Sequence, residues 1–311
     1  MRIPVPVSPY GTLTGDLFSY TMTPTNLVAF ETSPSRPSKC ILLGGLSDGL
    51  LPTPYTQGLS EQLPKHWSLV QPLLQSSYTG FGHGTLDRDV QDLEALLVYL
   101  QTHRHAESFA LVGHSTGCQC IVHYLKTKQP PQSLPLRLAV LQAPVSDREH
   151  AAASSQYAYF LSIAQDMRQQ GKLQEMMPRD AFWAPITAER YLDLQERGGK
   201  DDYFSSDYSP EELMERLQHV GLFGERQRED ETSDLSSRRF RCCVAYSGSD
   251  EYVPDHVDKA GLTERLVDAM NHGTSSPVAH PLYLPHSNHN LSNHEPERTK
   301  FMEHIVQLLQ D

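Results

Sequence analysis

The sequence G-H-S-T-G at residues 113–117 is the feature that most constrains what this chain folds into. It follows an apolar, strand-like segment at 108–112 and precedes a helix-like segment at 118–128. In a G-x-S-x-G pattern the two glycines have no Cβ, so the backbone can turn sharply from strand to helix and lift the serine clear of the sheet. Ser115 is therefore our candidate nucleophile. The plain alternative is a glycine-rich strand–helix corner with an inert serine.

Short apolar segments alternate with helical patterns over much of the chain. This alternation is typical of a mostly parallel sheet that is covered by helices on both faces. Residues 13–20 and 27–31 are expected to open the sheet as an antiparallel pair. Further strands are predicted at 40–43, 67–74, 108–112, 136–141, 241–247 and 279–284, and helices at 53–66, 86–102, 118–128, 257–271 and 296–310. The predicted fold class is therefore α/β.

The alternation stops after residue 146 and resumes at residue 240. The residues between, 147–239, contain helical patterns but no convincing strand. We predict that residues 1–146 and 240–311 form the α/β core. The segment 147–239 is predicted to be a helical cap or lid, inserted after the sixth strand.

Two patterns place helices within this insertion. Ser209 and Glu212 form a capping box with a proline at the first helical position, so a helix begins there. Further upstream, apolar residues share one helical face: Tyr157, Phe160, Leu161, Ala164 and Met167. Between residues 224 and 239 the only apolar residue is Leu235, and this polar stretch is expected to be mobile.

Charge and cysteine content exclude several classes of protein. The formal net charge of −12 argues against nucleic-acid binding, because no basic stripe is available to displace counterions from phosphates. No stretch approaches the roughly 20 apolar residues that span a bilayer, and the N-terminus lacks the apolar core of a signal peptide. The cysteines have the wrong spacing for a zinc site, so we expect buried, reduced thiols in a cytoplasmic protein. They are Cys40, Cys118, Cys120, Cys242 and Cys243.

A serine nucleophile needs a histidine to accept its proton and a carboxylate to orient that histidine. Where a G-x-S-x-G turn carries the serine, both come from loops after later strands, in the chain order serine, acid, histidine. Asp250 lies in a turn directly after the strand at 241–247 and is our candidate acid. The alternative is an ordinary turn or helix-capping aspartate. Glu251, one residue further on, is expected to face elsewhere.

Two histidines compete for the role of base. His286 lies at the very end of the strand at 279–284, whereas His289 lies deeper in the loop that must cross back toward Ser115. We favour His289. A hydrolytic mechanism of this kind needs no cofactor, and no metal site is predicted.

Acyl transfer also needs backbone N–H groups aimed at the oxyanion. One is the N–H of Thr116, directly after the nucleophile. The second is predicted to be the N–H of Leu46 in the glycine-rich loop at 44–49. The alternative is that this loop only forms a tight turn after the strand and has no catalytic role. A second glycine-rich segment, at 80–84, does not match a phosphate-binding pattern and is expected to line the rim of the site or to form a flexible turn.

With these residues in place, the chain resembles the α/β-hydrolase superfamily along nearly its whole length. Four blocks narrow the resemblance: LLGGLSDG at 42–49, SYTGFG at 77–82, GHSTGCQ at 113–119 and PVSDR at 144–148. They are similar to a group of fungal and plant α/β-hydrolases, long without an assigned function, that includes the intracellular fungal siderophore esterases.

The resemblance implies a substrate as well as a mechanism. It implies hydrolysis of ferric, fusarinine-type siderophores, in which ester bonds join hydroxamate units, through a triad of Ser115, Asp250 and His289. Opening the ring weakens iron chelation and releases iron inside the cell. Iron then arrives with the substrate and is not a cofactor. Fusarinine without N-acetyl groups carries free amines, which an acidic site would favour.

Other activities remain open at this point. The same triad serves a carboxylesterase or thioesterase for other acyl groups, and a haloperoxidase or C–C hydrolase. A hydrolase-fold receptor that binds without chemistry is a further alternative, although it does not require all three triad residues. Aromatic residues of the insertion either line a large pocket or form the insertion's own core: Phe160, Phe182, Trp183, Tyr203 and Phe204.

Overall fold

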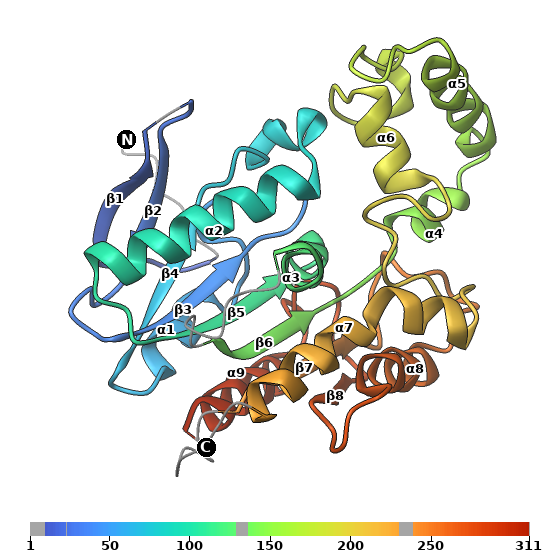
Figure 1. Ribbon diagram of the computed structural model, residues 1–311. Coiled ribbons are helices and arrows are strands. Elements are labelled where there is room, and N and C mark those ends of the chain that lie inside the picture. The colour runs from blue at the N-terminus through green and yellow to red at the C-terminus, as the bar shows by residue number, and fades with distance from the viewer. Residues whose placement is uncertain (1–9, 23, 129–135, 230–238, 311) are drawn as a thin grey trace, which may run out of the picture.

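The centre of the molecule is an eight-stranded sheet in the order β1-β2-β4-β3-β5-β6-β7-β8 (Figure 1). The structure is a computed structural model that describes residues 10–22, 24–128, 136–229 and 239–310. β1 pairs antiparallel with β2 and β2 with β4, and the other neighbours are parallel. The strands are β1 (Asp16–Thr21), β2 (Leu27–Glu31), β3 (Ser38–Leu43), β4 (Trp67–Pro72), β5 (Ser108–His114), β6 (Leu136–Gln142), β7 (Arg241–Ser247) and β8 (Ala279–Leu284). The predicted α/β fold with a mostly parallel sheet is confirmed.

Helices cover both faces of this sheet. One apolar cluster joins one face to α1 (Thr56–Gln62) and α9 (Glu295–Gln310). A second cluster joins the other face to α2 (Leu86–His103), α3 (Thr116–Thr127) and α8 (Lys259–Asn271). All six residues of β3 and all seven of β5 are buried, as expected for strands that pack on both sides.

Helix α1 is shorter than the helix predicted over 53–66. It begins at Thr56, after Pro52 and Pro54, and ends at Gln62. Leu63 precedes Pro64 and has an extended ψ of 140°, because a proline disfavours helical backbone in the residue before it. The proline therefore ends the helix before the apolar pattern does.

Between β6 and β7 the chain forms helices, with strand-like pairing limited in the described residues to an isolated bridge from Met176 to Thr187. The elements are α4 (Asp147–Ala152), α5 (Tyr157–Gln169), the 3-10 turn η2 (Arg179–Ala181), α6 (Ala188–Gln195) and α7 (Pro210–Glu229). Helices α4 to α6 stand apart from the sheet, above the end at which β5 and β6 finish (Figure 1). We use the name cap for residues 147–209.

Helix α7 lies with the core, although it follows the cap in sequence. It packs against α3 and α8, and its apolar side chains belong to the cluster that joins those helices to the sheet. Ser209 and Glu212 form the predicted capping box, with distances of 2.8 Å and 3.2 Å between backbone N and side-chain oxygen. The polar stretch predicted at 224–239 begins inside α7, and its residues 230–238 lie outside the described part of the chain.

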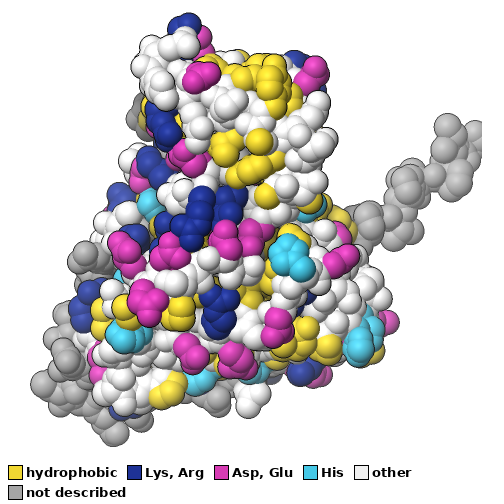
Figure 2. Space-filling model, turned by 90° about the vertical axis from the view of Figure 1, so that its right-hand side faces the viewer, with side chains coloured by type: hydrophobic (Ala, Val, Ile, Leu, Met, Phe, Trp, Pro, Cys, Tyr) yellow, Lys and Arg dark blue, Asp and Glu magenta, His cyan; other side chains and the backbone are white. Residues whose placement is uncertain are grey.

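The cap has a small apolar core of its own. Phe160 and Ala164 of α5 are buried against residues of α6, and Leu161 and Met167 pack at its edge, which confirms the predicted helical face. In the space-filling view the cap is the narrower upper part of the molecule, and hydrophobic side chains gather on it (Figure 2). Tyr203 and Phe204, near the end of the cap segment, belong instead to the large cluster that packs on the sheet.

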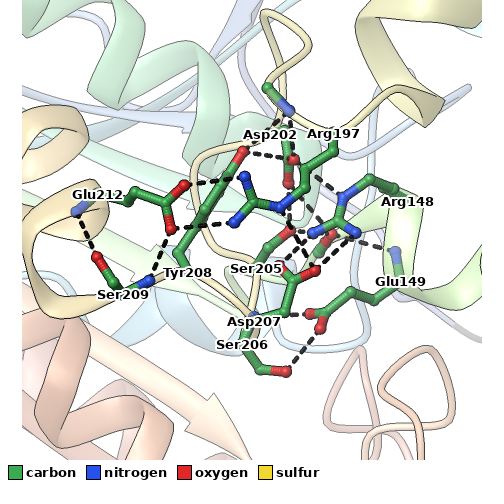
Figure 3. Close-up of polar contacts among 12 residues, drawn as sticks. Arg148, Glu149, Arg197, Asp202, Ser205, Ser206, Asp207, Tyr208, Ser209 and Glu212 are labelled. Atoms are coloured by element: carbon green, nitrogen blue, oxygen red, sulfur yellow. Dashed lines mark hydrogen bonds and ion pairs between the residues drawn. The ribbon is translucent and has the colours of Figure 1, made fainter.

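The two ends of the cap meet in a network of charged side chains (Figure 3). The Nε of Arg148, in α4, lies 3.0 Å from Asp202, and its Nη1 lies 3.1 Å from Asp207. Arg197 pairs with Glu212 at the start of α7 through both of its terminal nitrogens, at 2.9 Å and 3.0 Å. These contacts tie the segment that enters the cap to the segment that leaves it.

A second set of buried charges comes from the cap and from α2. Arg190 of α6 pairs with Asp201 at 2.6 Å, and both side chains are almost fully buried. Burial raises the pKa of Asp89 in α2 to about 6, and burial together with the charge of Asp201 raises the pKa of Asp193 to about 7. One arginine therefore lies among several carboxylates that are costly to ionise.

Asp193→Asn is expected to stabilise the protein at alkaline pH. The folded-state pKa of Asp193 is raised from 3.8 to about 7, so the unfolded chain ionises this carboxyl near pH 4 while the folded chain still holds the proton. Stability is therefore lost as pH rises from about 4 to about 7 and stays low above that range. Asparagine removes this cost, and we expect Tm to rise by about 2–4 °C at pH 8.5 and to change little at about pH 4. Thermal unfolding at the two pH values measures this, with the exposed Asp166→Asn as control. An equal shift at both pH values would contradict the assignment.

Candidate active site

The structure places Ser115 at the turn between β5 and α3, as the G-x-S-x-G pattern predicts. Its backbone has φ 53° and ψ −123°, a conformation that is strained for a residue with a Cβ. A Cβ on Gly113 would lie 2.6 Å from the backbone of Gly117, and one on Gly117 would lie 2.6 Å from the carbonyl of Leu43. Only glycine fits at these two positions, because the backbone passes so closely on either side of Ser115.

His289 and Asp250 meet at the ends of neighbouring strands. The Nδ1–H of His289 donates to Oδ2 of Asp250 at 2.8 Å, and the other oxygen of Asp250 accepts the backbone N–H of Tyr252 at 3.0 Å. Asp250 is 2% exposed, so the contact is shielded from water. Because Nδ1 carries the proton that Asp250 accepts, Nε2 of His289 is the nitrogen left to accept another.

The loop that carries His289 is fixed by residues that our sequence analysis did not select. Gln142, at the end of β6, donates from Nε2 to the carbonyl of His289 at 2.8 Å. Its Oε1 accepts from Nδ1–H of His114 at 2.6 Å and from the hydroxyl of Tyr55 at 3.2 Å. Burial lowers the pKa of His114 to about 3, so this ring is neutral. Gln142 thus connects the residue before the nucleophile to the backbone of the candidate base.

Two aromatic rings and one carboxylate complete the surroundings of His289. Its ring centroid lies 4.6 Å from that of Tyr252 and 4.9 Å from that of His114. Glu251 accepts the backbone N–H of His289 at 2.9 Å. Our expectation that Glu251 faces elsewhere is wrong. The turn after β7 directs both Asp250 and Glu251 toward the loop that carries His289.

His286, the competing histidine, contacts Glu297 and His294 and not Asp250. Its backbone N–H donates to the carboxylate of Glu297 at 3.1–3.2 Å, and its ring lies 5.3 Å from that of His294. It contacts α9 and the loop before that helix, whereas His289 contacts Asp250. The geometry supports the choice of His289.

The loop after β3 approaches the nucleophile closely. The N–H of Gly45 donates to Oδ2 of Asp48 at 2.7 Å, which folds residues 44–49 into a tight turn. Leu46, the next residue, lines the same cavity as Ser115. Thr116 opens α3, where the first N–H groups have no acceptor within the helix. Leu46 and Thr116 therefore stay our candidates for the oxyanion hole.

Gly45→Ala is expected to lower kcat by about 10²-fold, because a methyl group there would displace the nucleophile. The added Cβ would lie 2.8 Å from Cβ of Ser115, closer than side-chain carbons approach. Steady-state hydrolysis of p-nitrophenyl acetate measures the loss, and circular dichroism checks that the fold is kept. Full activity in the variant would show that this loop does not sit against Ser115.

Ser115 and His289 open into a cavity of about 510 Å³ between the sheet and the cap. Its acidic lining residues are Asp48, Asp147 and Glu251, and none of the described residues that line it is a lysine or an arginine. Burial, reinforced by Asp201, raises the pKa of Asp147 to about 6, and one of its oxygens has no hydrogen-bond partner. The cavity is therefore suited to a neutral or cationic ligand rather than to an anion.

Aromatic residues of the cap form another part of the cavity wall. Phe182 and Trp183 line it, supported from below by Phe81, whose ring centroid lies 5.0 Å from that of Trp183. Phe81 belongs to the 3-10 turn η1 (Tyr78–His83), so the glycine-rich segment 80–84 supports this wall. None of the helices in the described part of the chain is long and apolar enough to cross a membrane.

Comparisons with known proteins agree with this arrangement. The model of a family described as "Protein of unknown function (DUF1749)" matches residues 8–310. The chain is 32% identical to the fusarinine C esterase sidJ of Aspergillus fumigatus over 92% of each chain, and 29% identical to an esterase of Emericella nidulans over 77% of this chain and 76% of that one. The solved structure of the siderophore hydrolase EstB from Aspergillus fumigatus superposes with a TM-score of 0.75 at 30% identity, covering 96% of this chain and 98% of that one. The chain therefore belongs to the DUF1749 family and is an esterase with the α/β-hydrolase fold.

Proposed function

We propose that the protein is a serine ester hydrolase in which Ser115, His289 and Asp250 act as nucleophile, base and orienting acid. The observation that carries the proposal is that His289, hydrogen-bonded to Asp250 at 2.8 Å, lines the same cavity as Ser115. Nε2 of His289 takes the hydroxyl proton while Ser115 attacks the ester carbonyl. The N–H groups of Leu46 and Thr116 stabilise the oxyanion of the tetrahedral intermediate.

The first half of the cycle ends when the protonated imidazole of His289 gives its proton to the departing alcohol and leaves an acyl group on Ser115. In the second half a water molecule, deprotonated by the same nitrogen, attacks the acyl carbonyl. The bond to Ser115 then breaks, the imidazolium returns its proton to the serine oxygen, and the acid is released. Asp250 stabilises the imidazolium in both steps, and Gln142 keeps the His289 loop in position through its 2.8 Å contact with the backbone carbonyl.

We propose ferric fusarinine-type siderophores as the substrate and the cytoplasm as the place of reaction. Two relatives are named for activity on a siderophore or on fusarinine C, and the resemblance of the four sequence blocks points the same way. The carboxylates of Asp48, Asp147 and Glu251 favour the free amines of such a substrate. All five cysteines are unpaired and buried, which suits a reducing compartment.

Mass spectrometry of a ferric fusarinine-type triester incubated with the protein tests this proposal. Stepwise gains of one water mass, absent with the Ser115→Ala variant, are the expected result. A fluorophosphonate that labels Ser115 covalently tests the mechanism separately from the substrate. Labelling without ring opening would assign the enzyme to a different ester, and resistance to labelling would favour a binding protein without chemistry.

A further inference from the structure

A second cavity, of about 670 Å³, lies on the cap beside the catalytic one. It is lined by residues of α4, α5, η2 and α6 and of the turns beside them. Four residues line both cavities and so form the boundary between them: Ala151, Phe182, Trp183 and Gln195. A ligand whose ester group reaches Ser115 can therefore extend past this boundary into the cap cavity.

The wall of this cap cavity is aromatic and held in place. Trp183 is 59% exposed, an unusual position for so large an apolar side chain. The guanidinium of Arg179 donates to the carbonyl oxygens of Phe182 and Trp183 at 2.9 Å and 3.2 Å, which fixes the backbone of this turn. Tyr157 and Tyr191 contribute rings from α5 and α6. An exposed ring on a fixed backbone turn beside a cavity is suited to pack against a flat or apolar ligand.

Gln195, at the boundary between the cavities, has an unsatisfied polar atom. The residue is 3% exposed, yet Oε1 of its side chain has no hydrogen-bond partner. Burying an amide oxygen without a partner is destabilising. Its backbone is anchored, since the carbonyl accepts the hydroxyl of Tyr157 at 2.6 Å. A rotation of the amide would bring Oε1, which is buried in this structure, to the surface of the cavity, where a ligand N–H or O–H supplies the missing bond.

We propose that the cap cavity is a second substrate subsite, which binds the part of a large ester that is remote from the scissile bond. Trp183 and its neighbouring rings pack against an apolar or aromatic segment, and Oε1 of Gln195 accepts a hydrogen bond from an amide N–H or a hydroxyl of the same segment. The inference rests on the proposed ester hydrolysis at Ser115. The substrate class is therefore an extended ester that carries a hydrogen-bond donor several bonds from the reacting carbonyl.

Two matched pairs of esters test the subsite on both sides of the ester bond. On the acyl side, p-nitrophenyl 6-benzamidohexanoate is compared with p-nitrophenyl hexanoate. On the alcohol side, 6-benzamidohexyl acetate is compared with hexyl acetate. We expect kcat/KM to be higher by about tenfold or more for the benzamide member of at least one pair, since a hydrogen bond and ring burial contribute together.

Gln195→Met keeps the side-chain volume and removes the hydrogen bond, and Trp183→Ala removes the ring. Each is expected to lower the preference for the benzamide ester by about fivefold or more, mainly through KM. Tyr159→Ala is the control, because Tyr159 is 62% exposed on the same cap and lines neither cavity. Equal kcat/KM within both pairs, or a preference that survives both variants, would overturn the proposal.

Tryptophan fluorescence separates this inference from the catalytic one. The chain has two tryptophans. Trp67 is fully buried and Trp183 is 59% exposed, so a ligand in the cap changes the emission of Trp183. With the Ser115→Ala variant, N-hexylbenzamide is expected to cause a saturable change whose Kd rises about fivefold or more when Gln195→Met is added. Saturable binding without turnover of any ester would support the subsite and refute the esterase mechanism. Turnover without saturable binding would support the esterase mechanism and refute the subsite.

Discussion

Ser115→Ala lowers kcat for ester hydrolysis by roughly 10⁴-fold or more, while the substrate is still bound. The reason is that the variant has no atom to form the acyl-enzyme, so only water attack assisted by the oxyanion hole remains. The substitution costs little in folding, because alanine keeps the Cβ that packs beside Gly45 and removes only the hydroxyl. Steady-state kinetics with p-nitrophenyl acetate and with the siderophore ester measures the loss.

The control for this variant is covalent labelling. The unchanged protein should react with a fluorophosphonate and gain the mass of one adduct, and the alanine variant should not. Activity of the variant above about a tenth of the original would mean that another residue is the nucleophile. Labelling at a different residue would also show that Ser115 is not the nucleophile, and would identify the residue that is.

His289→Ala is expected to be nearly as severe, with a loss of kcat on the order of 10⁴-fold. Without the imidazole, no group accepts the proton of Ser115, and Asp250 is left buried with the loss of its 2.8 Å partner. His286→Ala provides a matched control from the same loop and is expected to change kcat by less than about threefold, since its ring faces His294.

The two histidine variants together decide the assignment. If His286→Ala were the severe one, the roles of the two histidines would be exchanged. A pH–rate profile adds a second readout, because a general base that must be neutral gives a rise in kcat/KM with pH as it loses its proton. That rise should vanish in the residual activity of His289→Ala and persist in His286→Ala.

Local sequence was sufficient for the features that depend on local geometry. The strand–turn–helix around Ser115 follows from two glycines at fixed spacing, and the start of α7 follows from the side chains of Ser209 and Glu212. The parallel order of strands follows from alternation of apolar and helical segments. Chain order also singled out Asp250 and His289, since each follows a strand that ends at the same edge of the sheet.

The residues that sequence could not supply act across long separations. Gln142 reaches the backbone of His289, 147 positions later, and nothing near Gln142 in the sequence signals that contact. Glu251 was misjudged because the direction of a side chain in a turn depends on the turn's geometry, which the motif does not set. The aromatic residues of the insertion take different places according to packing. Phe182 and Trp183 line the cap cavity, and Phe160 lines it from the cap's own core. Tyr203 and Phe204 belong to the large core cluster.

The meeting of the cap's two ends has a consequence for how such enzymes diversify. Arg148, near the start of the cap, contacts Asp202 and Asp207, near its end (Figure 3). The cap is therefore an insertion whose two ends are held together at the core. A segment whose ends already touch can be lengthened or exchanged at little entropic cost, because each doubling of its length costs only about 0.6 kcal/mol in loop closure. Lineages that keep the serine, aspartate and histidine in the core can therefore change their caps independently and acquire new substrates without rebuilding the chemistry.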